Sequence, residues 1–234
     1  MCNRIALPAD QELRDLVKDQ HIKVQEFDHY YHAFAYTHPQ VPIMTMDEPK
    51  VIKTSMWGLA PHWARDKEEA KNWVKQLVNA KSEKAGSTYK PYMGTQRCLV
   101  FVKGFYEFRW EDDKGKVKTP YFIYAEDQKP FTFGGIYNNW ADQSTGESFA
   151  TFTILTTPSN ELMSHIHNSG CRMPAIIGRD SWDTWLDPNA DISQFLRPYP
   201  DGFLKAHTIN RNLAKRDFNP NVPEIQLECK DTLF

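Results

Sequence analysis

The number of short strand-like runs is the feature of this sequence that most constrains its fold. These runs are rich in β-branched and aromatic residues, and turn-forming residues lie between them. The predicted strands cover residues 51–59, 98–108, 121–125, 131–137, 149–156, 173–177 and 203–209. Turn chemistry at 111–115 and 142–146 predicts antiparallel hairpins. Hairpins of this kind favour a sheet-based fold over a helical bundle.

The predicted helices are few and short. The clearest covers residues 66–78, where apolar residues recur at helical spacing and Asp66 with Glu69 forms a capping-box start. Shorter helices are predicted after Asp10, over 159–165 and over 180–186. We therefore expect an α+β fold: a twisted, barrel-like antiparallel β-sheet with small peripheral helices. No internal repeat or flexible linker divides the chain, which predicts a single domain over 1–234.

Charge and composition exclude several classes of protein. The 28 Lys and Arg residues against 30 Asp and Glu give a net charge of -2, so nucleic-acid binding would need a local basic surface. No apolar run approaches the roughly 18 residues of a membrane span, and the start lacks a signal peptide, so we expect a cytoplasmic protein without a membrane partner. The four cysteines are scattered without a C-x-x-C pair, which predicts free thiols and no structural zinc.

Cys2 is the first residue that suggests chemistry. Removal of Met1 would leave an α-amine and a thiol on one residue. The amine can condense with an aldehyde to an imine, and the adjacent thiol can close onto that imine to form a five-membered thiazolidine. The alternative is that Cys2 is a small buried residue on a first strand.

Two further segments combine aromatic and polar residues. Residues 57–63 place Trp57 and Trp63 around Gly and Pro, a pattern typical of a core turn but also suited to base stacking. Residues 79–83 follow the clearest helix and carry an amide, a cation and a carboxylate, as many solvated loops do.

Possible proton-transfer groups lie in two later segments. Glu107 interrupts an apolar strand, where it either faces solvent or is buried as a general acid or base. His165 and His167 precede Arg172. A metal site would need further ligands, so an acid/base histidine beside a phosphate-binding arginine fits this segment better.

Taken in order, these segments resemble the SRAP (SOS response-associated peptidase) family, whose members shield abasic sites in single-stranded DNA. The matching motifs are Met-Cys-x-Arg at 1–4, W-G-L-x-P-x-W at 57–63, N-A-R-S-E at 79–83, R-C-L at 97–99, G-F-Y-E-W at 104–108 and H-x-R-M-P at 167–174. The resemblance implies a twisted antiparallel β structure with peripheral helices and a positively charged DNA groove. It also implies a DNA-damage protein, part of the SOS response, that acts as a nucleoid-associated monomer without metal or cofactor.

The resemblance assigns a role to each matching residue. Cys2 would attack the ring-opened aldehyde of an abasic site and form a thiazolidine DNA–protein crosslink. Asn79 would orient the N-terminal residue and the sugar, Glu107 would assist ring opening and proton transfer, and His167 would act as acid/base in crosslink formation and reversal. The expected DNA contacts, made by stacking or by charge, are Arg4, Trp57, Trp63, Lys81, Arg97, Phe108 and Arg172.

The sequence departs from the family pattern at four places. Asn3 replaces Gly and narrows the approach to Cys2, Lys81 replaces Arg and loses bidentate geometry, and Phe108 replaces Trp with a smaller stacking face. Residues 168–171 separate His167 from Arg172 where the family has one residue, which leaves His165 as an alternative acid/base.

Three functions are compatible with these residues. The first is an abasic-site crosslinker with lyase or self-reversing activity. The second is a cysteine peptidase or amidohydrolase, acting on its own N-terminus, in which Cys2 attacks a carbonyl. The third is a non-catalytic single-strand-binding module that is indifferent to Cys2.

Overall fold

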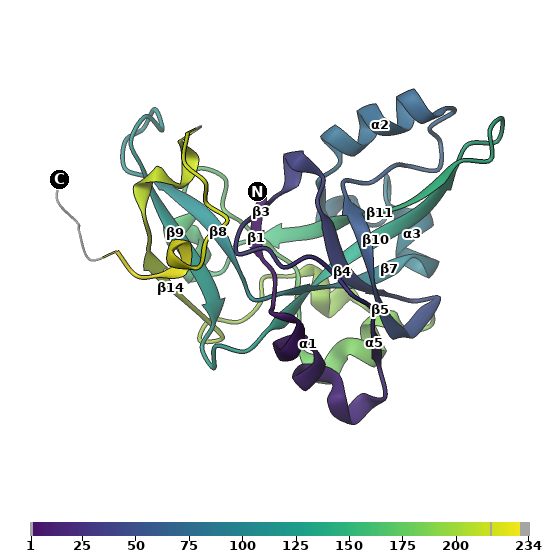
Figure 1. Ribbon diagram of the computed structural model, residues 1–234, viewed down its shortest axis with the longest axis horizontal. Coiled ribbons are helices and arrows are strands. Elements are labelled where there is room, and N and C mark those ends of the chain that lie inside the picture. Colours follow the sequence, from purple (N-terminus) through teal and green to yellow (C-terminus); the bar gives the residue numbers. More distant parts are fainter. Residues whose placement is uncertain (1, 216, 230–234) are drawn as a thin grey trace.

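The computed structural model describes residues 2–215 and 217–229, and two sheets share most of this chain (Figure 1). One sheet closes on itself into a barrel, and the second lies beside it. The N-terminal end of the chain runs between the two (Figure 1). This placement brings the first residues close to both sheets.

Five strands form the barrel. They are β4 (Gln40–Thr45), β5 (Glu48–Trp57), β7 (Arg97–Val102), β10 (Phe131–Ala141) and β11 (Ser148–Pro158). Neighbouring strands in the order β5-β4-β7-β10-β11 are antiparallel. The barrel closes through a parallel pairing of β11 with β5, in which Phe152 lies opposite Trp57. Closure removes the unpaired edges that an open sheet would expose.

Short strands extend the barrel sheet. They are β2 (Lys23–Val24), β6 (Asn79–Lys81), β12 (Arg172–Pro174) and β13 (Ile176–Ile177). β6 is parallel to β11 with Asn79 opposite Ile154, and β12 is antiparallel to β11 with Arg172 opposite Pro158. Two segments that carry predicted site residues are therefore fixed to one strand of the barrel.

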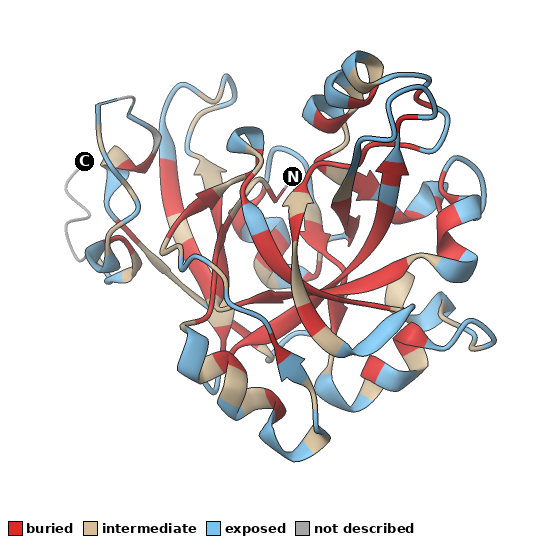
Figure 2. Cartoon of the chain, turned by 45° about the vertical axis from the view of Figure 1, so that its right-hand side comes forward, coloured by how far each residue is buried: buried red, intermediate tan, exposed pale blue. Residues whose placement is uncertain are grey.

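The second sheet has the order β14-β9-β8-β1-β3. Its strands are β14 (Leu204–Thr208), β9 (Lys118–Ala125), β8 (Gly104–Trp110), β1 (Arg4–Ala6) and β3 (Ala33–Phe34). One face packs against the barrel strands, with the rings of Phe105 and Phe133 5.6 Å apart in an edge-to-face contact. The other face is covered by the chain after β14, including Leu213 and Ile225. Figure 2 shows how burial follows both sheets.

The helices are short and lie outside the sheets (Figure 1). They are α1 (Asp10–Val17), α2 (Lys67–Gln76), α3 (Lys90–Thr95), α4 (Glu161–Ile166) and α5 (Trp182–Leu186), with single 3₁₀ turns between other elements. Asp66 caps α2 by accepting a hydrogen bond from Glu69 N at 2.8 Å. Within the described chain, no helix has the length and apolar character needed to cross a membrane.

The predicted α+β fold with a barrel-like sheet and small peripheral helices is confirmed, with three differences in strand detail. The strand predicted over 173–177 is two short strands, β12 paired with β11 and β13 paired with β10. The barrel is not wholly antiparallel, because β11 closes it in parallel with β5. The strand predicted over 98–108 is two strands in different sheets, separated at Lys103, whose N–H donates to Ala6 O at 2.8 Å.

Candidate functional site

Cys2 lies just before β1 and is buried, with 2% of its surface exposed. Its Sγ contacts Arg4 O at 4.0 Å. Burial raises the pKa of the Cys2 thiol well above its ordinary value, and the negative charge of Glu107 raises it further. The thiol is therefore held in its neutral form at neutral pH. Met1 lies outside the described residues, so its predicted removal remains a prediction.

Glu107 is buried in β8, with 6% of its surface exposed, and not turned to solvent. Its Oε2 accepts a hydrogen bond from Phe108 N at 3.3 Å. The charge of the same carboxylate acts on both Cys2 and Arg4. Burial lowers the pKa of the Arg4 guanidinium, and the negative charge of Glu107 opposes that fall. The structure thus places a buried carboxylate within electrostatic range of the thiol.

Asn79 connects β6 to the N-terminal segment. Its Nδ2 donates to Asn3 Oδ1 at 2.8 Å, and Asn3 O accepts from Ala35 N at 2.9 Å. The Oδ1 atom of Asn79 is buried and accepts no hydrogen bond from the described residues. Asn79 therefore positions the residue next to Cys2 and keeps one acceptor open. The Asn3 amide is a site residue to which the sequence assigned only a steric effect.

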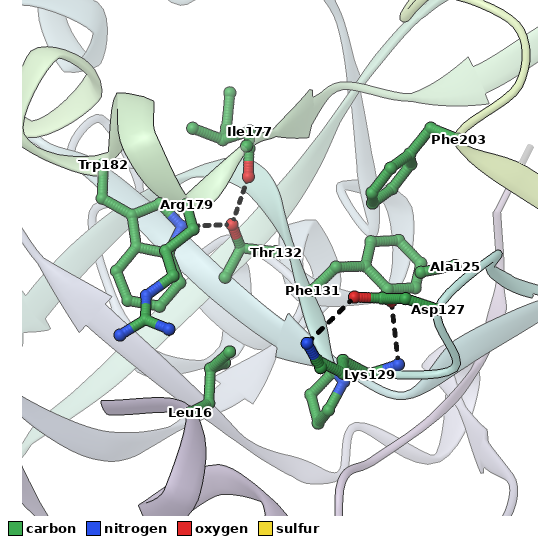
Figure 3. A pocket seen from close by; sticks show the side chains of 12 residues that line it. Leu16, Ala125, Asp127, Lys129, Phe131, Thr132, Ile177, Arg179, Trp182 and Phe203 are labelled. Atoms are coloured by element: carbon green, nitrogen blue, oxygen red, sulfur yellow. Dashed lines mark hydrogen bonds and ion pairs between the residues drawn. The ribbon is translucent and has the colours of Figure 1, made fainter. Parts of the chain in front are cut away.

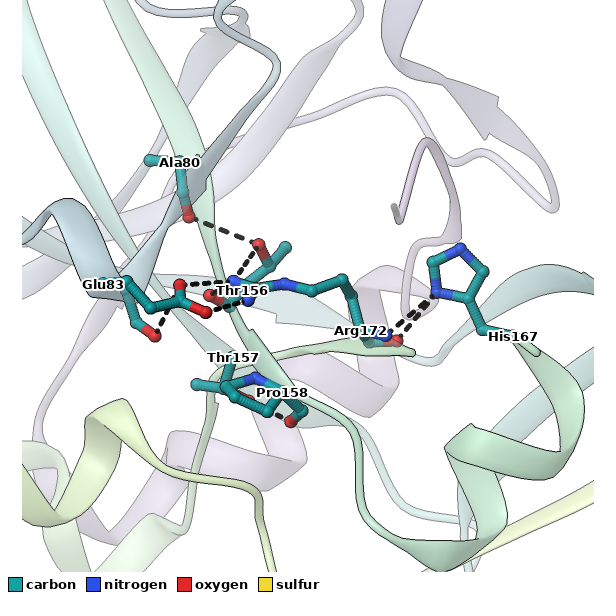
Figure 4. A network of polar contacts seen from close by, with 8 residues as sticks. Ala80, Glu83, Thr156, Thr157, Pro158, His167 and Arg172 are labelled. Carbon is teal, nitrogen blue, oxygen red and sulfur yellow. Dashed lines mark hydrogen bonds and ion pairs between the residues drawn. The ribbon is translucent and has the colours of Figure 1, made fainter. Parts of the chain in front are cut away.

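His167 ends α4 and is buried, with 6% of its surface exposed. Figure 4 shows its Nδ1 beside the main chain of Arg172, 3.0 Å from the carbonyl oxygen and 3.3 Å from the nitrogen. A Cβ on Gly170 would lie 2.9 Å from His167 Nε2, so a residue without a side chain lets this loop fold over the ring. The imidazole is fixed while the longer loop 168–171 bends around it.

His165 has a different environment. It is exposed, and its Nδ1 lies 3.1 Å from Arg109 Nη1. Asn168 ties the start of the loop to β8 by two hydrogen bonds to the main chain of Trp110. Its Oδ1 accepts from Trp110 N at 3.0 Å, and its Nδ2 donates to Trp110 O at 2.9 Å. The extra loop residues therefore leave the two histidines in distinct places, one buried and one at the surface.

Two of the predicted DNA contacts do not fit their positions. Trp57 is fully buried, stacked on Phe152, and donates from Nε1 to Val78 O at 2.9 Å. Arg97 is 2% exposed and donates to three main-chain carbonyls, those of Met93, Trp185 and Asp187. Neither side chain can reach a DNA strand, because the barrel and its flanking helices enclose both.

The backbone geometry at position 58, just after Trp57, requires glycine. Gly58 has a φ of +122°, and a Cβ there would lie 2.4 Å from Val74 O in α2. Only glycine allows this close approach of helix and strand. This part of the segment 57–63 is thus a packing motif, and Trp63, 37% exposed, is its only tryptophan with a large open surface.

The remaining predicted DNA contacts divide into paired and open groups. Arg172 forms a bidentate ion pair with Glu83 and also contacts Thr156 (Figure 4). Lys81 is exposed at the end of β6. Arg4 lies over the Phe34 ring at 4.1 Å and 5.8 Å from the Phe108 ring. Of these three cations, Lys81 is the exposed one, while Arg4 and Arg172 are half-buried.

The described residues contain no group of three or more His, Cys, Asp or Glu side chains that could hold a metal ion. All four cysteines are free, as the sequence predicts: Cys2 and Cys98 are buried, Cys171 is exposed and Cys229 is half-buried.

The chain is similar to known proteins in sequence and in fold. The chain is 30% identical over 232 residues to the abasic site processing protein YoqW of Bacillus subtilis (strain 168), covering 96% of this chain and 98% of that one. It is 33% identical over 175 residues to the abasic site processing protein HMCES of Gallus gallus, covering 64% of this chain and 50% of HMCES. A crystal structure of a protein from Bacteroides thetaiotaomicron superimposes with a TM-score of 0.86 at 30% identity, covering 97% of this chain and all of the other.

The family model described as SOS response associated peptidase (SRAP) matches residues 1–216. That match covers both sheets and every predicted site residue. The chain therefore belongs to the SRAP family.

Proposed function

We propose that this protein senses and shields abasic sites in single-stranded DNA by forming a thiazolidine crosslink through Cys2. Membership of the SRAP family and the names of its relatives support the substrate class. The observation that carries the mechanism is the position of Cys2, buried within electrostatic range of the Glu107 carboxylate and next to the Asn3–Asn79 hydrogen bond. One copy of the chain holds all of these groups, so the proposal needs no second subunit and no cofactor.

The proposed reaction has two steps. With Met1 removed, the α-amine of Cys2 attacks the aldehyde of the ring-opened sugar, and the imine forms with loss of one water. The thiol then adds across the C=N bond: sulfur bonds to carbon and the thiol proton passes to nitrogen. The second step is intramolecular, so it gains from the proximity of thiol and imine on one residue.

Glu107 and Asn79 have separate roles in this proposal. Glu107 moves protons during ring opening and imine formation, since its carboxylate lies close enough to influence the thiol. Asn79 offers its open Oδ1 to the α-amine or to a sugar hydroxyl, while its Nδ2 holds Asn3 in place. Both groups come from strands, which hold reacting groups more rigidly than loops do.

His167 is proposed as the acid/base for reversal of the crosslink and for strand cleavage at the abasic site. Imidazole is the side chain whose ordinary pKa lies nearest neutrality, and His167 is buried and fixed where His165 is exposed. Arg172 supports this position through its main chain, while its guanidinium is paired with Glu83.

We expect His167→Ala to slow release of a preformed crosslink at least about tenfold, because proton transfer to the leaving sugar is lost. Transfer of protein from a labelled to an unlabelled abasic strand measures this rate. His165→Ala is the matched control and should behave as wild type. The assignment is wrong if His165→Ala is the impaired variant, and the histidines are structural if neither variant is impaired.

DNA affinity in the proposal comes from open cations and rings near the reactive site. Lys81 contributes a phosphate contact, and Arg4, Phe108 and Trp63 contribute charge and stacking surface. Arg172 takes part only if its ion pair with Glu83 opens. Trp57 and Arg97 are not part of this surface.

Neutralising Lys81 should weaken binding to intact single-stranded DNA and make the slope of log affinity against log salt shallower by roughly 0.7. The measurement is a binding titration of Lys81→Gln at several salt concentrations. Lys50→Gln, at an exposed position in β5, is the control and should keep the wild-type slope. An unchanged slope for Lys81→Gln would place the DNA surface elsewhere.

The peptidase alternative is less well supported. A thiol that attacks an acyl carbonyl needs a thiolate, and reactive cysteines of that kind have lowered pKa values. Burial and Glu107 instead raise the pKa of the Cys2 thiol. In the crosslinking route the amine makes the first bond, so a neutral thiol is compatible with it.

The test of the proposal is incubation of the processed protein with an abasic oligonucleotide, followed by denaturing electrophoresis. A heat-stable band of protein plus DNA is expected with the abasic strand and not with the same strand carrying an intact base. Absence of that band at high protein concentration would contradict the proposed function.

A further inference from the structure

A pocket of about 610 Å³ lies beside Arg4 at the edge of the second sheet. Its wall combines the N-terminal strand, the segment 30–39 around β3 and residues of 213–215 and 218–221, which follow β14. The side chains that define its chemistry are Arg4, His32, Phe34, Lys215, Phe218 and Asn221. No step of the proposed reaction uses this pocket.

The pocket is lined by positively charged side chains, which can bind an anion, and by aromatic rings, on which a base can stack. Among the described residues that line it, Arg4 and Lys215 are cations and none is a carboxylate. The rings of Phe34 and Phe218 give it aromatic surface. This combination suits a nucleotide, since phosphate binds cations and every base can stack on an aromatic ring.

His32 adds an uncharged polar group to the wall. Arg4 Nη1 lies 3.0 Å from His32 Nε2, and because a guanidinium can only donate, Nε2 is the acceptor. Burial and the charge of Arg4 lower the pKa of His32 to about 4, so the ring is neutral at neutral pH. The side chain of Asn221 fixes this region by accepting from His32 N at 3.3 Å. The wall is thus held by contacts between distant parts of the chain.

Arg4 links the pocket to the reactive site. The guanidinium that lines the pocket also lies within the electrostatic reach of Glu107. Arg4 follows Cys2 by two residues, which corresponds to about 7 Å of extended chain. That distance is on the scale of one nucleotide step in an extended strand.

From this juxtaposition we propose that the pocket binds the nucleotide adjacent to the abasic site in the same strand. Arg4 and Lys215 hold its phosphate, and Phe34 and Phe218 hold its base. The inference rests on the proposed function, and it adds a subsite that makes the reaction faster when the abasic site has an intact neighbour.

A second pocket provides a contrast (Figure 3). It is lined in part by residues of the β9–β10 turn and by Arg179 and Trp182. Several of its polar groups are already paired: Thr132 Oγ1 with Ile177 O and Trp182 Nε1, at 2.7 and 2.9 Å, and Lys129 with Asp127 at 3.6 Å. Lys129 is therefore a suitable control position for Lys215.

The test compares crosslinking rates on short thymidine oligonucleotides with the abasic site at the 5′ end, at the 3′ end or in the middle. Wild-type protein should react at least about fivefold faster when the neighbour that fills the pocket is present. Phe218→Ala and Lys215→Gln should each remove the rate increase that the neighbouring nucleotide gives. Both variants should react at the wild-type rate with the strand that lacks this nucleotide. Lys129→Gln should behave as wild type.

Three results would overturn the inference. They are equal wild-type rates on all three strands, a full neighbour advantage in both pocket variants, and an equal slowing of all strands by both variants. If the wild-type protein crosslinks none of the strands, the proposed function fails instead. The pocket is then tested by binding of thymidine 5′-monophosphate, which Phe218→Ala must weaken if the pocket is a nucleotide site.

Discussion

Cys2→Ala is expected to abolish the heat-stable crosslink to an abasic strand. The variant keeps its α-amine and can still form an imine, but it has no sulfur to close the thiazolidine ring. The remaining imine is reversible and hydrolyses on heating, so denaturing electrophoresis should show no stable band. Reduction with borohydride before heating should recover a weaker one.

Two variants control this result. Cys2→Ser replaces the thiol with a poorer nucleophile and should also lose the stable band. Cys171→Ala removes an exposed thiol and should crosslink as wild type does. A full-strength, heat-stable adduct from Cys2→Ala would rule out the thiazolidine.

Glu107→Gln should slow crosslinking about 100-fold at neutral pH, which is the low end of the effect of losing a general acid–base group. Glutamine has nearly the same shape and retains an oxygen that can accept the hydrogen bond from Phe108 N. Binding to intact single-stranded DNA should therefore be unchanged. Glu111→Gln, just after the end of β8, is the matched control and should react at the wild-type rate.

The same variant has a second, independent readout. The negative charge of Glu107 raises the pKa of the Cys2 thiol because it disfavours the thiolate. Removal of that charge should lower the thiol pKa, which the pH dependence of alkylation of Cys2 can measure. Loss of both folding and DNA binding in Glu107→Gln would make Glu107 a structural residue of the sheet. An unchanged crosslinking rate would remove it from the mechanism.

Much of the fold is predictable because four of the five barrel strands lie in predicted strand runs; β4 (Gln40–Thr45) is the barrel strand that the sequence analysis missed. The runs at 51–59, 131–137 and 149–156 match β5, β10 and β11 within a few residues, and the turn at 142–146 joins β10 to β11. The change of sheet at Lys103 has no such signal. Residues on both sides of it are apolar and buried, so periodicity does not distinguish one long strand from two.

The reactive residues are more predictable than the DNA surface. Motifs identify which residues have the required chemistry, but burial depends on the rest of the fold. Arg97 reads as a cation near a strand, yet it is enclosed by carbonyls from Trp185 and Asp187, about 90 positions later in the chain. The Asn3–Asn79 hydrogen bond and the contact of His32 with Asn221 also join distant segments, and no local pattern predicts them.

The identity of the crosslinked atoms tests the central claim most directly. Proteolysis of the wild-type adduct, followed by mass spectrometry, should give an N-terminal peptide that starts at Cys2 and carries the abasic sugar. Its mass should equal the sum of peptide and sugar fragment less one water. The Cys2 sulfur should resist alkylation, and borohydride should leave the mass unchanged. A sugar attached to a lysine, or to a Cys2 whose thiol can still be alkylated, would contradict the account.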